Sequence, residues 1–300
     1  MVASTLCANA GNGQFGAGVD WQCRLMPVKV LDSNNNGLYS WWAQGINYAV
    51  AHGARVINLS SGGSSADNTL STAIFNAIQK GVIFITITHN DGVGTIRFPG
   101  SYSHSITLGA TDEGDLKTDF SNWGPQISLV APGIDIYGEG SSRTLENWHG
   151  TSFSAPLASG VCSLMASVRP DLNQTAAFNL LCLGADDQVG DSLDTPGFDT
   201  RYGWGRLNAY NSLLLATTRI SMVKVSDEAP VLSWTSPPNA SFKQPYQVQS
   251  APGPGGQWSD VTVSGRFTYT TNSTSWTGPA IQAPDGERFY RVVLRSLGTK

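Results

Sequence analysis

Short apolar runs rich in β-branched residues alternate with segments of helical spacing in the N-terminal part of the chain, and this alternation constrains the fold most. The runs Pro27–Leu31, Arg55–Ser60 and Val82–Thr88 have the length and composition of buried strands. Apolar residues recur at helical spacing between them, over about residues 40–52 and again from Leu70 to Ile78. Strand–helix–strand order implies right-handed crossovers, so the sequence predicts an α/β fold with helices on both faces of a parallel sheet.

The C-terminal part of the chain has a different character. Further helices are predicted over about residues 151–167, 173–183 and 208–216. Glycine- and proline-rich turns then separate short runs with strand character: Val231–Trp234, Tyr246–Gln249, Val261–Val263 and Phe289–Leu294. We therefore expect two domains, an α/β domain over residues 1–218 and a small all-β sandwich over residues 219–300.

Charge and composition narrow the classes of partner. The net charge is −4 and the isoelectric point is about 5.5, so the chain has no basic footprint for nucleic acid. No run of about 18 apolar residues occurs, so no membrane span is expected. Charged residues make up only 13% of the chain, which is typical of secreted proteins, and we expect an extracellular or cell-envelope location. No signal peptide is visible at Met1, and the sequence does not indicate an oligomeric state.

The four cysteines do not form a metal-binding pattern. None belongs to a Cys-x-x-Cys pair, so zinc is not expected and no metal ligand is assigned. Cys162 and Cys182 fall within apolar helical runs, where buried free thiols are expected. Cys7 and Cys23 flank a Gly/Asn-rich loop, and their spacing leaves both a disulfide and two free thiols open.

Residues 149–160 read His-Gly-Thr-Ser-Phe-Ser-Ala-Pro-Leu-Ala-Ser-Gly and form the most informative stretch of the chain. Gly150 allows close backbone approach, and Ser152 then stands at the start of a helix, near unpaired N–H groups that favour negative charge. Pro156 suits the first turn of that helix. Thr151 and Ser152 alone would be read as helix caps, but the pattern continues to Gly160, well beyond a cap.

This pattern, Gly-Thr-Ser-x-Ser-Ala-Pro-x-x-x-Gly, resembles the nucleophile motif of the subtilisin-like serine peptidases (subtilases). Other stretches resemble landmarks of that family in the same order: Val56–Gly63, Phe84–Gly92, Ile106–Asp112 and Gly203–Ala209. The resemblance covers about residues 1–218. It implies a serine endopeptidase that hydrolyses peptide bonds of protein or peptide substrates through an acyl-enzyme on Ser152.

The resemblance also implies roles for residues that follow the predicted strands. Asn90 matches the side chain that donates to the oxyanion, although an asparagine before Asp-Gly is also a common turn residue. Ser60, Ser61 and Gly62 match the segment that binds the substrate backbone. His89 stands where the family usually has glycine, so its side chain is expected to line or crowd the pocket for the residue before the cleaved bond.

The family's catalytic histidine and aspartate have no counterpart in the chain. The opening segment from Met1 to Leu6 matches only the tail of the histidine motif, so we expect an N-terminal truncation that removes the first strand and the start of the histidine helix. His52 is followed by glycine but closes a predicted helix. Two alternatives stay open: an inactive truncated pseudopeptidase, and a secreted peptide- or glycan-binding protein that acts through its C-terminal module, which resembles fibronectin-like modules.

No cofactor is expected from the motifs. Some subtilases hold calcium in the region of the Asn9–Gly13 loop, but this loop contains no carboxylate, and calcium usually binds at least one Asp or Glu. Calcium stays open, and no ligand is assigned.

Overall fold

The computed structural model describes residues 1–140, 143–218, 223–225, 231–236, 246–252, 257–261, 266–269, 273–278, 288–295 and 297. The chain divides into two compact units: the first runs from Met1 to Leu213, and the second begins at Leu214. This division falls inside helix α6 (Ala209–Thr217), slightly before the predicted boundary after residue 218.

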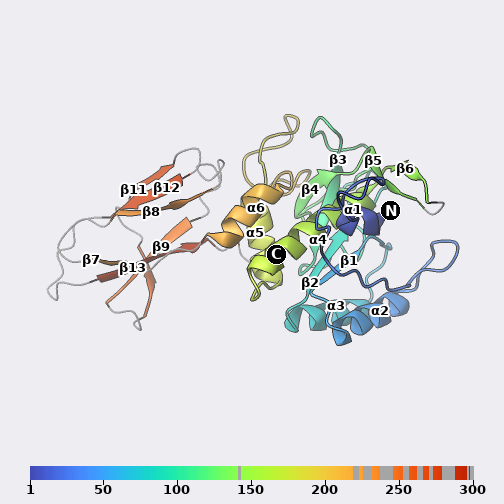
Figure 1. The fold of residues 1–300 in the computed structure, drawn as a ribbon, viewed down its shortest axis with the longest axis horizontal. Helices are drawn as coiled ribbons and strands as arrows, with labels where there is room; N and C mark the ends of the chain where they lie inside the picture. The colour runs from blue at the N-terminus through green and yellow to red at the C-terminus, as the bar shows by residue number, and fades with distance from the viewer. Residues whose placement is uncertain are drawn as a thin grey trace. The chain divides into compact units, whose positions relative to one another are not determined.

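A four-stranded parallel sheet forms the centre of the first unit (Figure 1). Its strands follow one another in sequence order: β1 (Val56–Leu59), β2 (Ile83–Ile87), β3 (Ile106–Thr111) and β4 (Leu129–Pro132). All residues of β2 and β3 are buried, as expected for strands covered on both faces. The parallel sheet predicted from the strand–helix alternation is confirmed.

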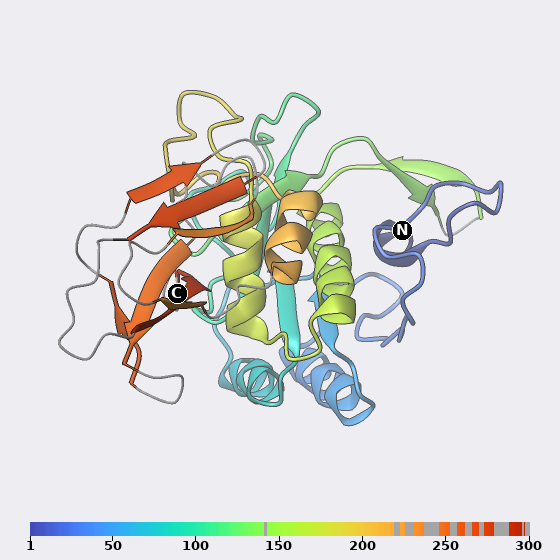
Figure 2. The same ribbon diagram turned by 60° about the vertical axis from the view of Figure 1, so that its left-hand side comes forward.

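Helices cover both faces of this sheet (Figure 2). α2 (Tyr39–Ala51) and α3 (Asn68–Gln79) share a buried cluster with Leu59 and Phe84 of the strands. The long helix α4 (Thr151–Val168) packs against all four strands, and α5 (Gln174–Gly184) lies next to it. The remaining elements of this unit are the short helix α1 (Val2–Cys7) and an antiparallel hairpin of β5 (Ile136–Glu139) and β6 (Leu145–Trp148).

The strand predicted over Pro27–Leu31 is wrong. These residues have no regular secondary structure, and Pro27, Val28 and Val30 line a cavity of about 1270 Å³ whose lining also includes β1. Within the described residues β1 pairs with β2 only, so its outer edge faces this cavity. A strand needs a hydrogen-bonding neighbour, and the cavity separates this apolar run from the sheet it would join.

Helix α4 has the length and apolar composition of a membrane span. However, 61% of it is buried inside the protein, where it packs against the sheet. Core helices of folded domains commonly share these properties, so α4 is weak evidence for a membrane span.

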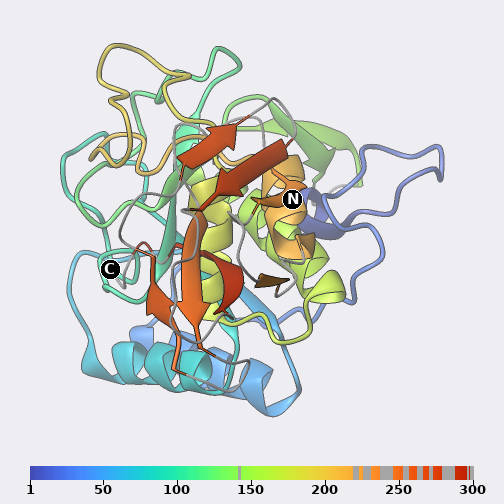
Figure 3. The same ribbon diagram turned by 90° about the vertical axis from the view of Figure 1, so that its left-hand side faces the viewer.

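Two antiparallel sheets form the second unit (Figures 1 and 3). One has the order β10-β9-β13-β7 and the other β11-β12-β8. The strands are β7 (Val223–Val225), β8 (Val231–Thr235), β9 (Tyr246–Ala251), β10 (Ser259–Asp260), β11 (Arg266–Tyr269), β12 (Ser273–Thr277) and β13 (Arg288–Leu294). Of the predicted Val261–Val263 strand, Val261 lies outside β10, and the other two residues lie outside the described residues.

Aromatic side chains connect the two sheets of the second unit. The rings of Trp234 on β8 and Tyr246 on β9 meet edge to face at 4.9 Å between centroids, and Trp276 on β12 lies 5.5 Å from Tyr290 on β13. All four side chains are buried. These tryptophans therefore belong to the interior between the sheets and not to an exposed binding face.

Candidate active site

Ser152 is the second residue of α4, and Gly150 stands immediately before the helix. Gly150 has φ 139° and ψ 155°, a combination that is essentially restricted to glycine. The chain therefore turns sharply before the helix begins. Within the described residues neither the hydroxyl nor the backbone N–H of Ser152 has a hydrogen-bond partner, so both groups are free to meet a ligand.

Asn90, which follows β2, binds directly to the start of the same helix. Its Oδ1 accepts hydrogen bonds from the backbone N–H of Thr151 at 2.9 Å and from the Thr151 hydroxyl at 2.8 Å. Because a backbone N–H can only donate, the amide oxygen must face Thr151 and the NH₂ group must point elsewhere. Nδ2 lies on the side of Gly150, 3.2 Å from where a Cβ on that residue would be. The amide donor and the Ser152 N–H are thus brought to one helix end.

The carbonyl group of Ser152 is held by a side chain from β1's end. The sequence predicted Pro156 in the first turn of α4. It is instead the sixth residue of the helix. Proline has no N–H, so the carbonyl oxygen four residues earlier, that of Ser152, loses its helical partner. The hydroxyl of Ser60 donates to this oxygen at 3.0 Å and replaces the missing bond.

Two polar side chains extend this contact into the interior, and no role was predicted for either. The Asn58 amide donates to the Ser60 hydroxyl at 2.9 Å and accepts from the Ser159 hydroxyl at 3.1 Å. Asn58 is on β1 and Ser159 is on α4, so the chain of bonds fixes the helix to the sheet beside Ser152. A polar residue inside the apolar run Val56–Leu59 was the available signal.

The segment 60–62 leaves its backbone unpaired. Within the described residues it makes no backbone hydrogen bond, whereas Gly63 immediately after it exchanges two with Phe98, at 2.7 and 2.9 Å. A Cβ on Gly62 would lie 3.1 Å from the ring of His89 and 3.1 Å from the Phe98 carbonyl oxygen. Ser61 and Gly62 therefore offer free N–H and C=O groups beside His89, the arrangement that an added extended peptide requires.

His89 occupies a strained position in a charged cluster. Its φ of 89° lies in the left-handed region, which favours glycine. Its Nδ1 lies 3.1 Å from Asp91 Oδ2, and the same oxygen accepts from Arg97 Nε at 2.8 Å and from Asn122 Nδ2 at 2.9 Å. The hydrogen bond from Arg97, with further bonding from Asn122, holds the pKa of Asp91 well below its usual range. Asp91 is thus a carboxylate at neutral pH.

None of the four histidines of the chain bonds to Ser152. His52 binds a carbonyl oxygen of its own helix at 2.8 Å, and His149 accepts the backbone N–H of Asp135 at 3.2 Å. His104 is half-buried and stacks on a tyrosine, and burial lowers its pKa. Each imidazole is engaged away from the Ser152 hydroxyl.

Metal-binding groups are not clustered in the part of the chain that the structure describes: no three His, Cys, Asp or Glu side chains could together hold an ion there. In the Asn9–Gly13 loop, the Asn12 side chain accepts from the backbone N–H of Gln14 at 3.0 Å. This oxygen is already used within the loop. The structure therefore assigns no calcium ligand.

Known proteins resemble the first unit. Residues 1–205 match the Peptidase_S8 family, described as the Subtilase family. The cell wall-associated protease of Bacillus subtilis (strain 168) is 32% identical over 75% of this chain and 27% of that protein. Thermitase of Thermoactinomyces vulgaris is 31% identical over 70% of this chain and 72% of thermitase. The solved structure of the prenylagaramide maturation protease PagA has a TM-score of 0.62 and 30% identity, and the match covers 71% of this chain and 79% of that one.

The chain thus spans about a quarter of the length of the first relative and nearly three quarters of thermitase. The structural match agrees with the parallel sheet and its covering helices. The family match over most of the chain, together with thermitase, shows that this chain belongs to the subtilase family of serine peptidases.

Proposed function

We propose that the chain carries the nucleophile and the oxyanion site of a serine endopeptidase that acts on proteins or peptides. Ser152 Oγ attacks the carbonyl carbon of the peptide bond and forms a tetrahedral intermediate. The C–N bond then breaks, the amine leaves with a proton, and an ester on Ser152 remains until water hydrolyses it. The observation that carries this proposal is the orientation of Asn90, whose oxygen is fixed by Thr151.

The oxyanion of the intermediate accepts two hydrogen bonds in this proposal, from the Ser152 N–H and from Asn90 Nδ2. Both donors are held before the substrate arrives, one by the start of α4 and the other by the bonds between Asn90 and Thr151. Donors that need no rearrangement stabilise the transition state most. The unpaired backbone of residues 60–62 adds the substrate as a strand, which positions its carbonyl group.

A base is also required, because a serine hydroxyl is a weak nucleophile at neutral pH. The four histidines of the chain are engaged elsewhere. We therefore expect the 300-residue chain to hydrolyse peptides slowly by itself, and a histidine from another polypeptide segment to complete the site. The name of the cell wall-associated relative supports an extracellular or cell-envelope location.

Covalent labelling tests the nucleophile without requiring full turnover. The full chain is incubated with a fluorophosphonate probe, with and without added imidazole as an external base, and the labelled peptide is identified by mass spectrometry. We expect slow labelling at Ser152 that accelerates with imidazole concentration. Ser152→Ala should lose the label, while Ser167→Ala, which removes an exposed hydroxyl from the same helix, should keep it.

Labelling spread over many serines at similar rates, with Ser152 not preferred, would refute the proposed nucleophile. If Ser152 is inert while extended peptides still bind to the segment 60–62, the alternative of a peptide-binding pseudopeptidase gains support. Rapid casein hydrolysis by the chain alone would instead contradict the expectation that the base lies outside it.

A further inference from the structure

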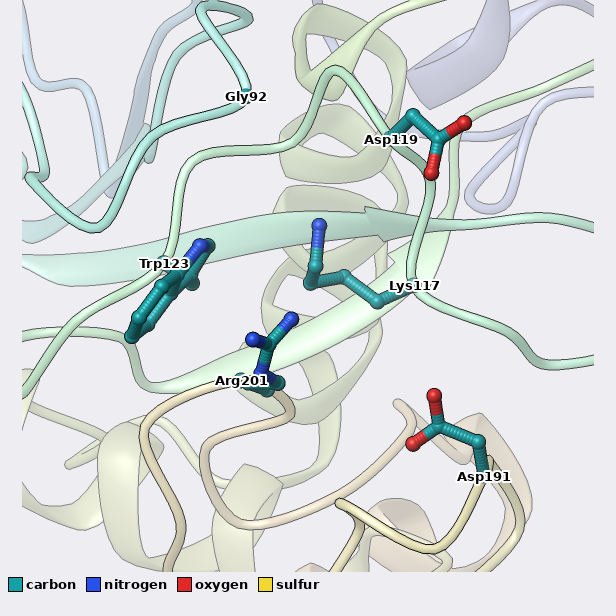
Figure 4. A pocket seen from close by; sticks show the side chains of 6 residues that line it. All are labelled: Gly92, Lys117, Asp119, Trp123, Asp191 and Arg201. Carbon is teal, nitrogen blue, oxygen red and sulfur yellow. The ribbon is translucent and has the colours of Figure 1, made fainter.

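A second, polar cavity of about 400 Å³ lies beside the loop that follows Asn90 (Figure 4). Its lining combines two cations, two carboxylates and one aromatic ring. The residues that line it are Gly92, Lys117, Asp119, Trp123, Asp191 and Arg201. No ion pair within the described residues joins these charges to one another. None of the residues that bind Ser152 or Thr151 lines this cavity.

Lys117 is half-buried and forms no ion pair within the described residues, although the charges of Asp119 and Asp191 act on it. Its ammonium group donates to the carbonyl oxygens of Thr118 and Ser121, at 2.6 and 3.1 Å, both on its own segment. Burial, followed by the charge of Arg201, lowers the pKa of Lys117. An ammonium group has three N–H donors, so one remains for a bound molecule.

Arg201 reaches the same space from a different segment. Its guanidinium group lies over the ring of Trp123, 4.5 Å from the centroid, and within the described residues its side chain makes no hydrogen bond or ion pair. Figure 4 shows the terminal nitrogens of Lys117 and Arg201 pointing into one space beside Trp123. A guanidinium group held flat on a ring presents its N–H fork in a fixed direction, which suits a carboxylate.

Asp119 and Asp191 bring two carboxylates to the lining of the same cavity. Asp191 and Asp119 are exposed, and Asp191 Oδ1 accepts the Leu193 N–H at 2.9 Å. Their charges oppose the entry of a simple anion, while the two cations oppose a simple cation. A molecule with both charges satisfies both groups at once.

We propose that this cavity binds a small zwitterion, a free amino acid or a dipeptide, with its carboxylate on Lys117 and Arg201 and its ammonium group toward Asp191. The volume of about 400 Å³ lies at the lower end of the range for small-molecule sites, about 300–1,000 Å³. The site is independent of the Ser152 chemistry, so the peptidase proposal and this one can fail separately.

Isothermal titration calorimetry on the full chain in low-salt buffer tests the site. The probes are glycine, glycylglycine, acetate and methylammonium. We expect glycine or glycylglycine to bind at one site, at least about tenfold more tightly than acetate or methylammonium. Tighter binding of glycine assigns a free amino acid as the ligand class, and tighter binding of glycylglycine assigns a dipeptide.

Variants assign the contacts. Lys117→Gln and Arg201→Gln should each weaken zwitterion binding at least about tenfold, and Asp191→Asn should weaken it without weakening acetate. Lys80→Gln, at an exposed lysine after α3, is the matched control and should change nothing. Equal affinity for glycine and acetate, or unchanged binding in Lys117→Gln and Arg201→Gln proteins with intact circular dichroism, would overturn the proposal.

Discussion

The bonds between Asn90 and Thr151 can be tested by replacing Asn90 with alanine. Thr151 is fully buried, and its N–H and hydroxyl donate only to Asn90 Oδ1, at 2.9 and 2.8 Å. Alanine removes the one oxygen that accepts both bonds, and Gly150 offers no side chain to replace the cap at the start of α4. Loss of a helix cap costs about 1 kcal/mol, and a buried donor without an acceptor costs about 1–3 kcal/mol.

Asn90 itself is exposed, so water can reach part of the vacated space. We therefore expect the lower part of the combined range, a loss of about 1–2 kcal/mol in the free energy of unfolding. For a unit of this size each kcal/mol lowers the melting temperature by about 2–4 °C. Differential scanning calorimetry of the full chain should show the transition of the first unit lowered by roughly 2–8 °C.

Asn90→Asp is the matched control for this experiment. The carboxylate keeps an acceptor for Thr151 and places a negative charge at the helix N-terminus, which is favourable, but it has no N–H to donate. It should melt within about 2 °C of the wild type and yet label Ser152 at least about tenfold more slowly, because the oxyanion donor is lost. If alanine leaves the melting temperature unchanged, or aspartate lowers it as far as alanine does, the inferred orientation of the Asn90 amide is wrong.

Three further outcomes are expected. Gly150→Ala should destabilise the first unit by about 2 kcal/mol or more, because its φ of 139° suits only glycine and the new Cβ would lie 3.2 Å from Asn90 Nδ2; an unchanged denaturation midpoint would contradict this. His89→Gly should be about 1 kcal/mol more stable than His89→Ala in urea unfolding, since the φ of 89° strains both histidine and alanine; the reverse order would count against the strain. Burial and the neighbouring Cys7 thiol raise the pKa of Cys23 to about 12, so the two thiols are close. Mild oxidation should therefore join Cys7 to Cys23 and lower the number of free thiols from four to two. Peptide mapping that shows other pairs would exclude this pairing.

Local sequence patterns were sufficient to predict most helices and strands of the first unit. The helical spacing of Leu70 to Ile78 predicted α3, whose start is fixed by the Asp67 side chain accepting from the Leu70 N–H at 2.7 Å. The apolar run from Val82 to Thr88 predicted β2, which is buried throughout. In these cases the residues that decide the element lie within the element or directly beside it, so a single sequence contains the necessary information.

The wrong prediction of a strand at Pro27–Leu31 shows that local sequence patterns do not predict whether a strand finds a neighbour. Its residues have strand composition, but β structure is completed by hydrogen bonds to a neighbour, and a cavity of about 1270 Å³ lies between this run and β1. The C-terminal strands were predicted with less success for a related reason. Their pairing depends on partners far along the chain, as in the register of β13 with both β7 and β9.

The candidate site depends on distant contacts even more strongly than the strands do. The motif around Ser152 predicted the nucleophile proposed above, but the sequence could not show that Pro156 frees the Ser152 carbonyl oxygen and that Ser60, 92 residues earlier, donates to it. Nor could it show that Asn90, 61 residues before Thr151, caps the same helix. The start of α4 is therefore incomplete as a helix end by itself, and its backbone groups gain these partners only when the segments that follow β1 and β2 pack against it.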